Sequence, residues 1–248
     1  MEPAFTINRN RRSNSSEYAP SVNGRLALEF EHSLYRLGHT LLPRVLEQGD
    51  GKPALELGES LFQSPAIFRT SADLDALIRG FAHQRHEKLD CQVVDGVRNT
   101  LVVDEPGTAG TLFDLPAINL ARDLELGLPS YNQARVGFGL PAVKSFSQTF
   151  DTDSAARLAS AYATVDDIDL FAGGICEQST GAGHTGPLIT AVLLRQLEDL
   201  RAADRFWYEN VLSKREIDEV ERYTLATLIA KNSGVSRSEL NANAFKVR

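Results

Sequence analysis

Leu34-Tyr-Arg-Leu-Gly-His-Thr-Leu-Leu-Pro43 is the stretch of sequence around which the chain can be organised, with His39 at its centre. It lies in a helical pattern that we predict to run from about Leu26 to Glu47. Apolar residues recur on two roughly opposite sides of this pattern, so we expect a helix that is buried on both. One stripe contains Phe30, Leu34, Leu37, Leu41 and Val45, and the other contains Tyr35, His39, Leu42 and Leu46.

A histidine on the inner face of a buried helix needs a hydrogen-bond partner or a metal ion. From spacing alone, a hydrogen-bonded core histidine is the first interpretation of His39, and a metal ligand is the alternative. His32 lies seven residues earlier on the same face, about 10.5 Å away along the helix axis. The two rings cannot share one ion, so we interpret His32 as a surface or core polar group.

The longer run Glu29-Phe-Glu-His-Ser-Leu-Tyr-Arg-Leu-Gly-His-Thr-Leu-Leu-Pro43 resembles the proximal-histidine helix of the animal-type haem peroxidases, in their bacterial branch. In that family, the His of an Arg-x-Gly-His motif is the axial ligand of the haem iron. The resemblance implies this role for His39 and a haem-propionate contact for Arg36. It also implies haem b as the iron cofactor and a mainly α-helical fold with almost no β structure.

A second motif follows about 80 residues later, in Phe113-Asp-Leu-Pro-Ala-Ile-Asn-Leu-Ala-Arg-Asp123 and Gly127-Leu-Pro-Ser-Tyr-Asn132. Asp114 is predicted to cap a short helix that has Pro116 in its first turn. Both stretches are similar to a motif of the same family. They therefore strengthen the resemblance with a second, distant part of the chain.

In the family, the first Asn of this motif accepts the ring N–H of the proximal histidine, which implies that Asn119 pairs with His39. Such a partner fixes the orientation of a metal-bound imidazole and tunes its basicity. Arg122, one turn further on, corresponds to a basic residue near the haem. The chain departs from the family at Leu124-Glu-Leu-Gly127, where a basic residue is replaced by Leu124, beside the packing of Asn119.

The resemblance covers about residues 18 to 235, but only the C-terminal half of the family's catalytic domain. The family's distal His and Arg, which transfer protons and stabilise charge on peroxide, lie before the proximal motif. Only 38 residues precede His39, and they contain no Arg-Glu-His-Asn run. We expect a haem peroxidase-type protein with a proximal ligand but no catalytic residue of its own, in keeping with a truncated or split enzyme.

Such a protein would act on hydrogen peroxide and an unassigned donor, and would be weak or inactive in isolation. Its partners would be a distal-half polypeptide or a second copy of itself. A non-catalytic haem-binding fragment or helical interaction module remains an alternative. A fatty-acid dioxygenase of the cyclooxygenase type is another, but that branch has a radical tyrosine three residues before the proximal histidine. Here that position is Arg36, and Tyr35 is four residues before His39.

The composition sets broader limits. Of 248 residues, 42% are hydrophobic, yet no run reaches the ~20 apolar residues of a membrane span. The net charge of −7 is spread over interspersed charges, which argues against a nucleic-acid partner. We predict a disordered lead-in over residues 1–17 and one domain, the proximal part of the peroxidase-like fold, over residues 18–248. The sequence shows no signal peptide, whereas family members are often secreted, so no compartment is assigned.

Other candidate metal sites are weaker. Cys91 and Cys176 form no Cys-x-x-Cys motif and no framework, although a single disulfide between them remains open. The spacing of His83 and His86, beside Glu87, would suit a metal, but without a clear third ligand we interpret it as a solvated face.

The oxygen-rich run Thr149-Phe-Asp-Thr-Asp-Ser154 is interpreted as the cap of a helix over residues 155–162, and calcium is not expected in this half. His184 lies among glycines in a loop, and we assign it no role. Elsewhere we predict a loop over residues 52–70, helices after Ser71, over residues 93–101 and from Gly186 to Arg201, and one last long helix. The last helix begins at the capping box Ser213-Lys-Arg-Glu216.

Overall fold

The structure is a computed structural model that describes residues 18–102, 111–181 and 183–247. The predicted lead-in, residues 1–17, lies outside this part. The fold is 54% helical with 3% strand, which confirms a mainly α-helical class. Two short antiparallel pairs form the strands, β1 (Val45–Leu46) with β2 (Leu55–Glu56) and β3 (Thr100–Val102) with β4 (Thr111–Phe113).

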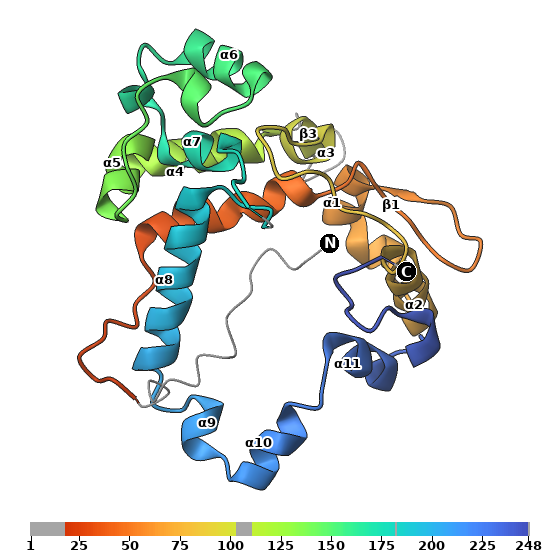
Figure 1. The fold of residues 1–248 in the computed structure, drawn as a ribbon. Helices are drawn as coiled ribbons and strands as arrows, with labels where there is room; N and C mark the ends of the chain where they lie inside the picture. Colours follow the sequence, from red (N-terminus) through yellow and green to blue (C-terminus); the bar gives the residue numbers. More distant parts are fainter. Residues whose placement is uncertain (1–17, 103–110, 182, 248) are drawn as a thin grey trace.

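The helices follow one another as an open ring in Figure 1. In chain order they are η1 (Glu29–Ser33), η2 (Leu34–Leu41), α1 (Leu57–Ile67), α2 (Ser71–Phe81), α3 (Asp95–Arg98), α4 (Leu115–Glu125), α5 (Tyr131–Gly137), η3 (Phe146–Gln148), α6 (Thr152–Ala161), η4 (Val165–Asp167), α7 (Leu170–Cys176), α8 (Pro187–Ala203), α9 (Tyr208–Val211), α10 (Lys214–Val220), α11 (Leu225–Asn232) and η5 (Arg237–Glu239). None of the described helices is long and apolar enough to cross a membrane.

The segment that carries His39 is a π-helical turn, η1, followed by the 3-10 helix η2. It ends at Leu41, so the helix predicted to continue to Glu47 was wrong over its last part. A proline disfavours helical backbone at the residue before it. Leu42, which precedes Pro43, is accordingly extended, with φ −71° and ψ 129°.

The first of the two predicted apolar stripes is the more deeply buried. Phe30, Leu34 and Leu37 are between 0% and 8% exposed, whereas Tyr35 of the second stripe is 60% exposed. The ring of Tyr35 stacks on that of Phe30, with 4.6 Å between the centroids. The deeply buried side of η2 packs on α7 and α8, whereas the second stripe is exposed at Tyr35 and partly buried at His39, so the predicted burial on both sides holds only in part.

The main hydrophobic core lies where η1, η2, α4, α5, α7 and α8 meet, and we call this region the His39 junction. Its largest fully buried side chains include Tyr131 and Phe171. Helix α7 approaches closely through Gly173 and Gly174, because a Cβ atom there would collide with Tyr131 and with Leu34, respectively. The two glycines therefore bring α7 against both η2 and α5.

Beyond α8, the chain continues as α9, α10 and α11, which we call the C-terminal arm. In Figure 1 the arm curves back towards α2. Its small core contains Ala226, Val235 and Leu240, with Ile78 and Ala82 packed against it.

Arg79 of α2 links segments at this end of the ring through three hydrogen bonds. Its Nε donates to Glu239 at 2.7 Å, its Nη1 to Asp50 at 2.9 Å and its Nη2 to the carbonyl of Gly234 at 2.8 Å.

Three element predictions need correction. Residues 52–70, predicted as a loop, contain helix α1, whose Leu57 is 2% exposed and whose Gly58 and Pro65 obscured the helical pattern. The helix predicted over residues 93–101 is only the four-residue α3, because the chain then enters β3. The last long helix is two helices, since Thr224 forms a second capping box with Thr227.

The predicted helix caps agree better with the structure than the predicted helix lengths do. Asp114 accepts from the backbone N of Ala117 at 3.0 Å, and the Ser213–Glu216 capping box begins α10. Thr70, one residue before the predicted Ser71, caps α2.

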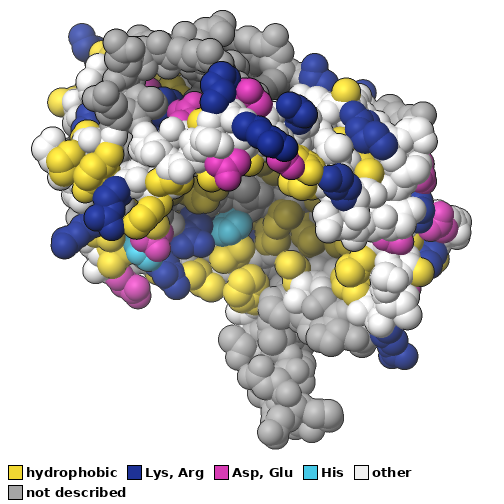
Figure 2. Space-filling model, turned by 90° about the horizontal axis from the view of Figure 1, so that it is seen from below, with side chains coloured by type: hydrophobic (Ala, Val, Ile, Leu, Met, Phe, Trp, Pro, Cys, Tyr) yellow, Lys and Arg dark blue, Asp and Glu magenta, His cyan; other side chains and the backbone are white. Residues whose placement is uncertain are grey.

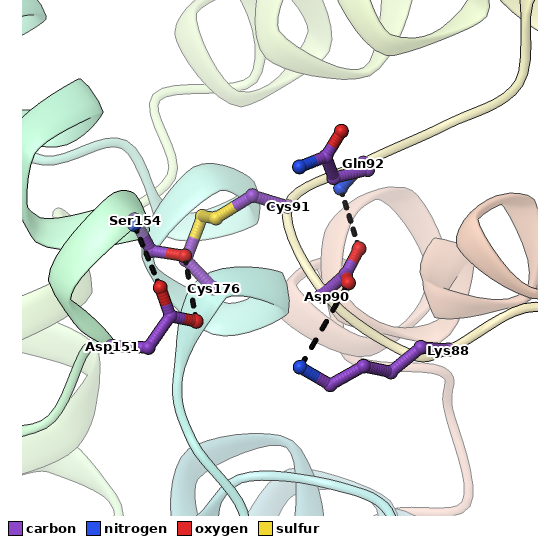
Figure 3. Close-up of a disulfide and its surroundings, with 7 residues drawn as sticks. All are labelled: Lys88, Asp90, Cys91, Gln92, Asp151, Ser154 and Cys176. Atoms are coloured by element: carbon purple, nitrogen blue, oxygen red, sulfur yellow. Dashed lines mark hydrogen bonds and ion pairs between the residues drawn. A yellow bond between two sulfur atoms is a disulfide. The ribbon is translucent and has the colours of Figure 1, made fainter.

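A disulfide joins Cys91 to Cys176, with 4.7 Å between the Cα atoms. The sequence alone had left this pairing open. It ties the segment after α2 to the end of α7, as Figure 3 shows. Beside it, Asp151 accepts from the backbone N of Ser154 at 2.8 Å and caps α6, as predicted for this oxygen-rich run. The cross-link therefore holds a loop against the His39 junction.

Candidate functional site

The centre of the site is a contact between two side chains that are 80 residues apart in the sequence. Nδ2 of Asn119, on α4, lies 3.0 Å from Nδ1 of His39, on η2. Asn119 is 3% exposed, and His39 is partly buried. The structure therefore brings together the two residues that the motifs predicted to pair.

The direction of this hydrogen bond differs from the prediction. An amide nitrogen only donates, so in the arrangement observed Nδ1 of His39 accepts from Asn119. The ring proton of the neutral imidazole then resides on Nε2. Rotation of the amide by 180° would place its oxygen opposite Nδ1 instead, and the ring N–H at Nδ1 could then donate to Asn119, leaving Nε2 free of its proton.

The surroundings favour the neutral form of His39. Burial lowers the pKa of its imidazole, and the positive charge of Arg36 lowers it further. A neutral ring is the form that binds metal ions. The electrostatics at this position therefore keep His39 in a ligand-competent state at neutral pH.

Arg36 lies one turn before His39, and its Nε is buried with no hydrogen-bond partner among the residues that the structure describes. A buried charged donor of this kind calls for an anionic acceptor. Arg122 is exposed on α4, three residues after Asn119 and thus on a neighbouring part of the same helix face. The two predicted basic residues thus come from the two helices that form the His39–Asn119 pair.

Leu124, the departure from the family pattern, is 72% exposed. At this exposure it contributes little to the packing under Asn119. The residue that is buried below Asn119 on α4 is Asp123, which is 4% exposed. Sequence reasoning missed Asp123, although its spacing of four residues from Asn119 places both on one helix face.

A second buried polar group supports α7 and α8 behind η2. Glu177 forms an ion pair with Arg135 and accepts from the hydroxyl of Tyr131 at 2.7 Å. Its other oxygen accepts from the backbone N of Leu188 at 2.7 Å, in the first turn of α8. Burial raises the pKa of Glu177, whereas these donors lower it. The cluster fixes the helices against which η2 packs.

The other histidines are not gathered into a metal site. The rings of His86 and His184 meet edge to face, with 5.9 Å between centroids, beside a polar pocket that Glu177 and Gln178 also line. Within residues 18–102, 111–181 and 183–247, no group of three or more His, Cys, Asp and Glu side chains could hold a metal ion. His32 lies 3.8 Å from Glu31, and its Nδ1 is buried.

One face of the molecule is hollowed and largely apolar. Figure 2 shows hydrophobic side chains gathered in this hollow, with His and with Lys or Arg side chains at its edge. Several large apolar residues are exposed on the molecule, among them Leu26, Leu28 and Tyr35 next to or within the helix of His39. The region around the site thus combines exposed apolar surface with cationic groups.

Comparison with known proteins gives a consistent result. A family model described as animal haem peroxidase matches residues 3–245. Peroxinectin A of Dictyostelium discoideum is 32% identical over 221 residues, which are 87% of this chain and 40% of that protein. Dual oxidase of Drosophila melanogaster is 29% identical over 93% of this chain and 16% of its own length. The chain thus spans less than half the length of these curated relatives.

Solved structures show the same fold. Peroxidase A from Dictyostelium discoideum superposes with a TM-score of 0.79 and 29% identity, over 92% of this chain and 44% of that one. A fatty acid alpha-dioxygenase of Arabidopsis thaliana gives a TM-score of 0.74 at 18% identity, over 94% of this chain and 40% of its own. At that identity, the second match supports a shared fold alone.

Proposed function

Because the chain belongs to the animal haem peroxidase family, we propose that it binds haem with His39 as the axial ligand of the iron. Asn119 is the partner that orients this ligand, and residues 18–248 form the proximal part of a peroxidase site. The observation that carries the proposal is the 3.0 Å contact between the Asn119 amide and Nδ1 of His39. A metal-bound histidine needs such a partner on its second ring nitrogen.

The residues present fit haem b. With the Asn119 amide turned so that its oxygen accepts from Nδ1–H, Nε2 is free to bind iron, and the lowered pKa of His39 keeps the ring neutral. The buried Nε of Arg36 has no acceptor within the described part of the chain, and a haem propionate would supply a carboxylate oxygen. Arg122 is the second basic group on this side. These features together favour a haem over a bare metal ion, for which the described residues offer no further ligands.

A haem iron bound there would supply two-electron reduction of hydrogen peroxide and oxidation of a donor substrate. The contribution of this chain is to orient His39 and to raise its electron-donating strength through Asn119, once the amide oxygen accepts from Nδ1–H. We assign no residue of the chain to proton transfer at the peroxide. Full turnover therefore depends on groups on the opposite face of the haem, and this chain alone is expected to be a weak catalyst.

The test is a haemin titration of the wild-type chain, of His39→Gly and of His32→Ala, followed by absorption spectroscopy. The His32 variant is a matched control because it removes an imidazole seven residues away in the same helical segment. Wild type and His32→Ala should give the same histidine-ligated spectrum. His39→Gly should lose this spectrum and regain it when free imidazole is added.

The outcome that would overturn the proposal is a His39→Gly spectrum identical to that of wild type without imidazole. Loss of the histidine-ligated spectrum in His32→Ala, and not in His39→Gly, would indicate that His32 is the ligand.

A further inference from the structure

Asp123 is a buried carboxylate for which neither the sequence motif nor the proposed function has a use. It lies four residues beyond Asn119 on α4, about 6 Å further along the helix axis. The residue is only 4% exposed. An aspartate is rarely buried to this extent unless it is paired, because desolvation of its charge costs free energy. Its position so close to the site therefore requires an explanation.

The carboxylate stands where three elements of the His39 junction meet. Its Oδ2 accepts from the backbone N of Phe171, in the first turn of α7, at 2.7 Å. Ser33, whose hydroxyl is fully buried, lies close enough to lower the pKa of Asp123. Ser33 is the last residue of η1, and η2 with His39 begins at the next residue. Asp123 thus connects α4 to α7 and to the start of the helix that carries the ligand.

No cation compensates this charge among the described interactions. Burial raises the pKa of Asp123, and so does the neighbouring carboxylate of Asp169, whereas the Phe171 N–H and the Ser33 hydroxyl lower it. Asp169 itself accepts from the hydroxyl of Tyr162 at 2.8 Å. The groups that face Asp123 are therefore Ser33 from η1, the N–H of Phe171 and Asp169 from the start of α7, and Tyr162 from the end of α6.

A fixed structural bridge would not need a charge in this place. An uncharged side chain of the same shape could accept from the Phe171 N–H, and it would avoid both the desolvation of a carboxylate and the repulsion from Asp169. What the carboxylate adds is strength, because hydrogen bonds to an ionised acceptor are shorter and stronger than those to a neutral one. That strength acts on α4 one turn from Asn119.

We infer that Asp123 is a positioning residue whose negative charge holds α4 against η1 and α7, and thereby holds Asn119 against His39. The inference rests on the proposed function, since its consequence is the strength of His39 as a ligand. Protonation of Asp123 weakens the hydrogen bond that it accepts from the Phe171 N–H and its attraction to the nearby Ser33 hydroxyl, and α4 then gains freedom relative to η2. The Asn119–His39 contact therefore depends on pH through the side chain of a residue one helical turn away from Asn119.

The first experiment uses the haem-free chain. The side-chain amide resonance of Asn119, assigned by its loss in Asn119→Ala, is followed by ¹⁵N NMR as the pH is lowered. In wild type it should shift in a transition above the ordinary aspartate pKa of about 3.9. Protonation of His39 shifts the same resonance in every variant, so the transition due to Asp123 is the one that Asp123→Asn lacks. Asp114→Asn is the matched control, because it removes the same charge from the same helix at its cap and should titrate like wild type.

The second experiment measures the ferric/ferrous reduction potential of the haemin-loaded chain. Asp123→Asn should move the potential in the same direction as Asn119→Ala, and haemin affinity should fall by less than the ~10–100-fold expected for a direct outer-shell partner. Asp114→Asn should leave both unchanged. If Asp123→Asn does not fold, Ser33→Ala replaces it: loss of the hydroxyl raises the pKa of Asp123 and should move the Asn119 transition to higher pH.

The inference is overturned if the Asn119 resonance and the potential in Asp123→Asn match those of wild type at every pH. It is also overturned if Ser33→Ala leaves the Asn119 transition where it was. Failure of the proposed function looks different: haemin would not bind through His39, whereas the haem-free NMR titration would still report whether Asp123 and Asn119 are coupled.

Discussion

The His39 junction and the C-terminal arm are both helical, but they are held together by different interactions. In the junction, eighteen buried hydrophobic residues form one cluster, whereas the cluster of the arm has three. The arm leaves large apolar residues exposed, among them Val220, Leu225 and Leu228, at 44% to 48%. Tertiary packing therefore stabilises the junction far more than it stabilises the arm.

The polar groups of the two regions also differ, in their burial and in how far along the chain their partners lie. The arm uses local capping boxes, Ser213 with Glu216 and Thr224 with Thr227, which lie at the surface. The junction buries charged and amide side chains that contact distant parts of the chain, namely Asn119, Asp123 and Glu177. Buried polar groups cost free energy unless they are paired. Their concentration around His39 indicates that the junction is organised for a site as well as for stability.

The largest expected difference between the two regions comes from a single leucine in each. Leu34→Ala, at a fully buried position, should lower the free energy of unfolding by about 3–5 kcal/mol. Leu228→Ala, at a position that is 45% exposed, should cost about 1 kcal/mol or less. Urea unfolding followed by circular dichroism gives both values. Equal losses would contradict the contrast between junction and arm.

The disulfide should give the next largest effect. Cys91 and Cys176 are separated by 85 residues, and a cross-link of a loop of this size typically contributes about 2–4 kcal/mol. The Cys91→Ser/Cys176→Ser double variant, compared with wild type with and without a dithiol reductant, measures this contribution. Loss of stability should be the same in the variant and in the reduced wild type. A stable reduced protein would show that packing alone holds the loop.

Substitution of Asp123 should have a smaller effect on the free energy of unfolding, and it should raise this free energy instead of lowering it. Because its folded-state pKa is raised, the stability that its protonation provides is present at low pH and is lost as pH rises through the folded-state pKa. Asp123→Asn should therefore increase the free energy of unfolding at pH 7 by an amount on the order of 1 kcal/mol, and leave it nearly unchanged in acid. Denaturant titrations at both pH values test this. A loss of stability at pH 7 would show instead that the interactions of the charged Asp123 outweigh the cost of burying its charge.

The parts of the fold that local sequence determines were predictable. The capping residues Asp114 and Ser213 predict where their helices begin, because each side chain accepts a hydrogen bond from a backbone N–H only three residues away. Helix α1 was missed because Gly58 and Pro65 weaken the local helical signal, and its placement comes from tertiary contacts with α3.

The site, too, could be predicted only in part from local sequence. The pairing of Asn119 with His39 spans 80 residues, and no local pattern predicts it. It was predicted only because both motifs resemble one family. Asp123 lies outside what that resemblance assigns, and its partners come from η1 and α7, so only the folded chain reveals its position. The unequal burial of the two sides of η2 was likewise decided by which helices meet it.

The most direct test of the proposed function asks whether Asn119 acts on iron through His39. Resonance Raman spectroscopy of the haem-loaded, ferrous chain measures the iron–imidazole stretching frequency, which reports the electron-donating strength of the ligand. Asn119→Ala should lower this frequency, and Asn119→Asp, which restores an acceptor, should raise it again, while His39→Gly abolishes the band. A frequency that is the same in wild type and Asn119→Ala would contradict the account.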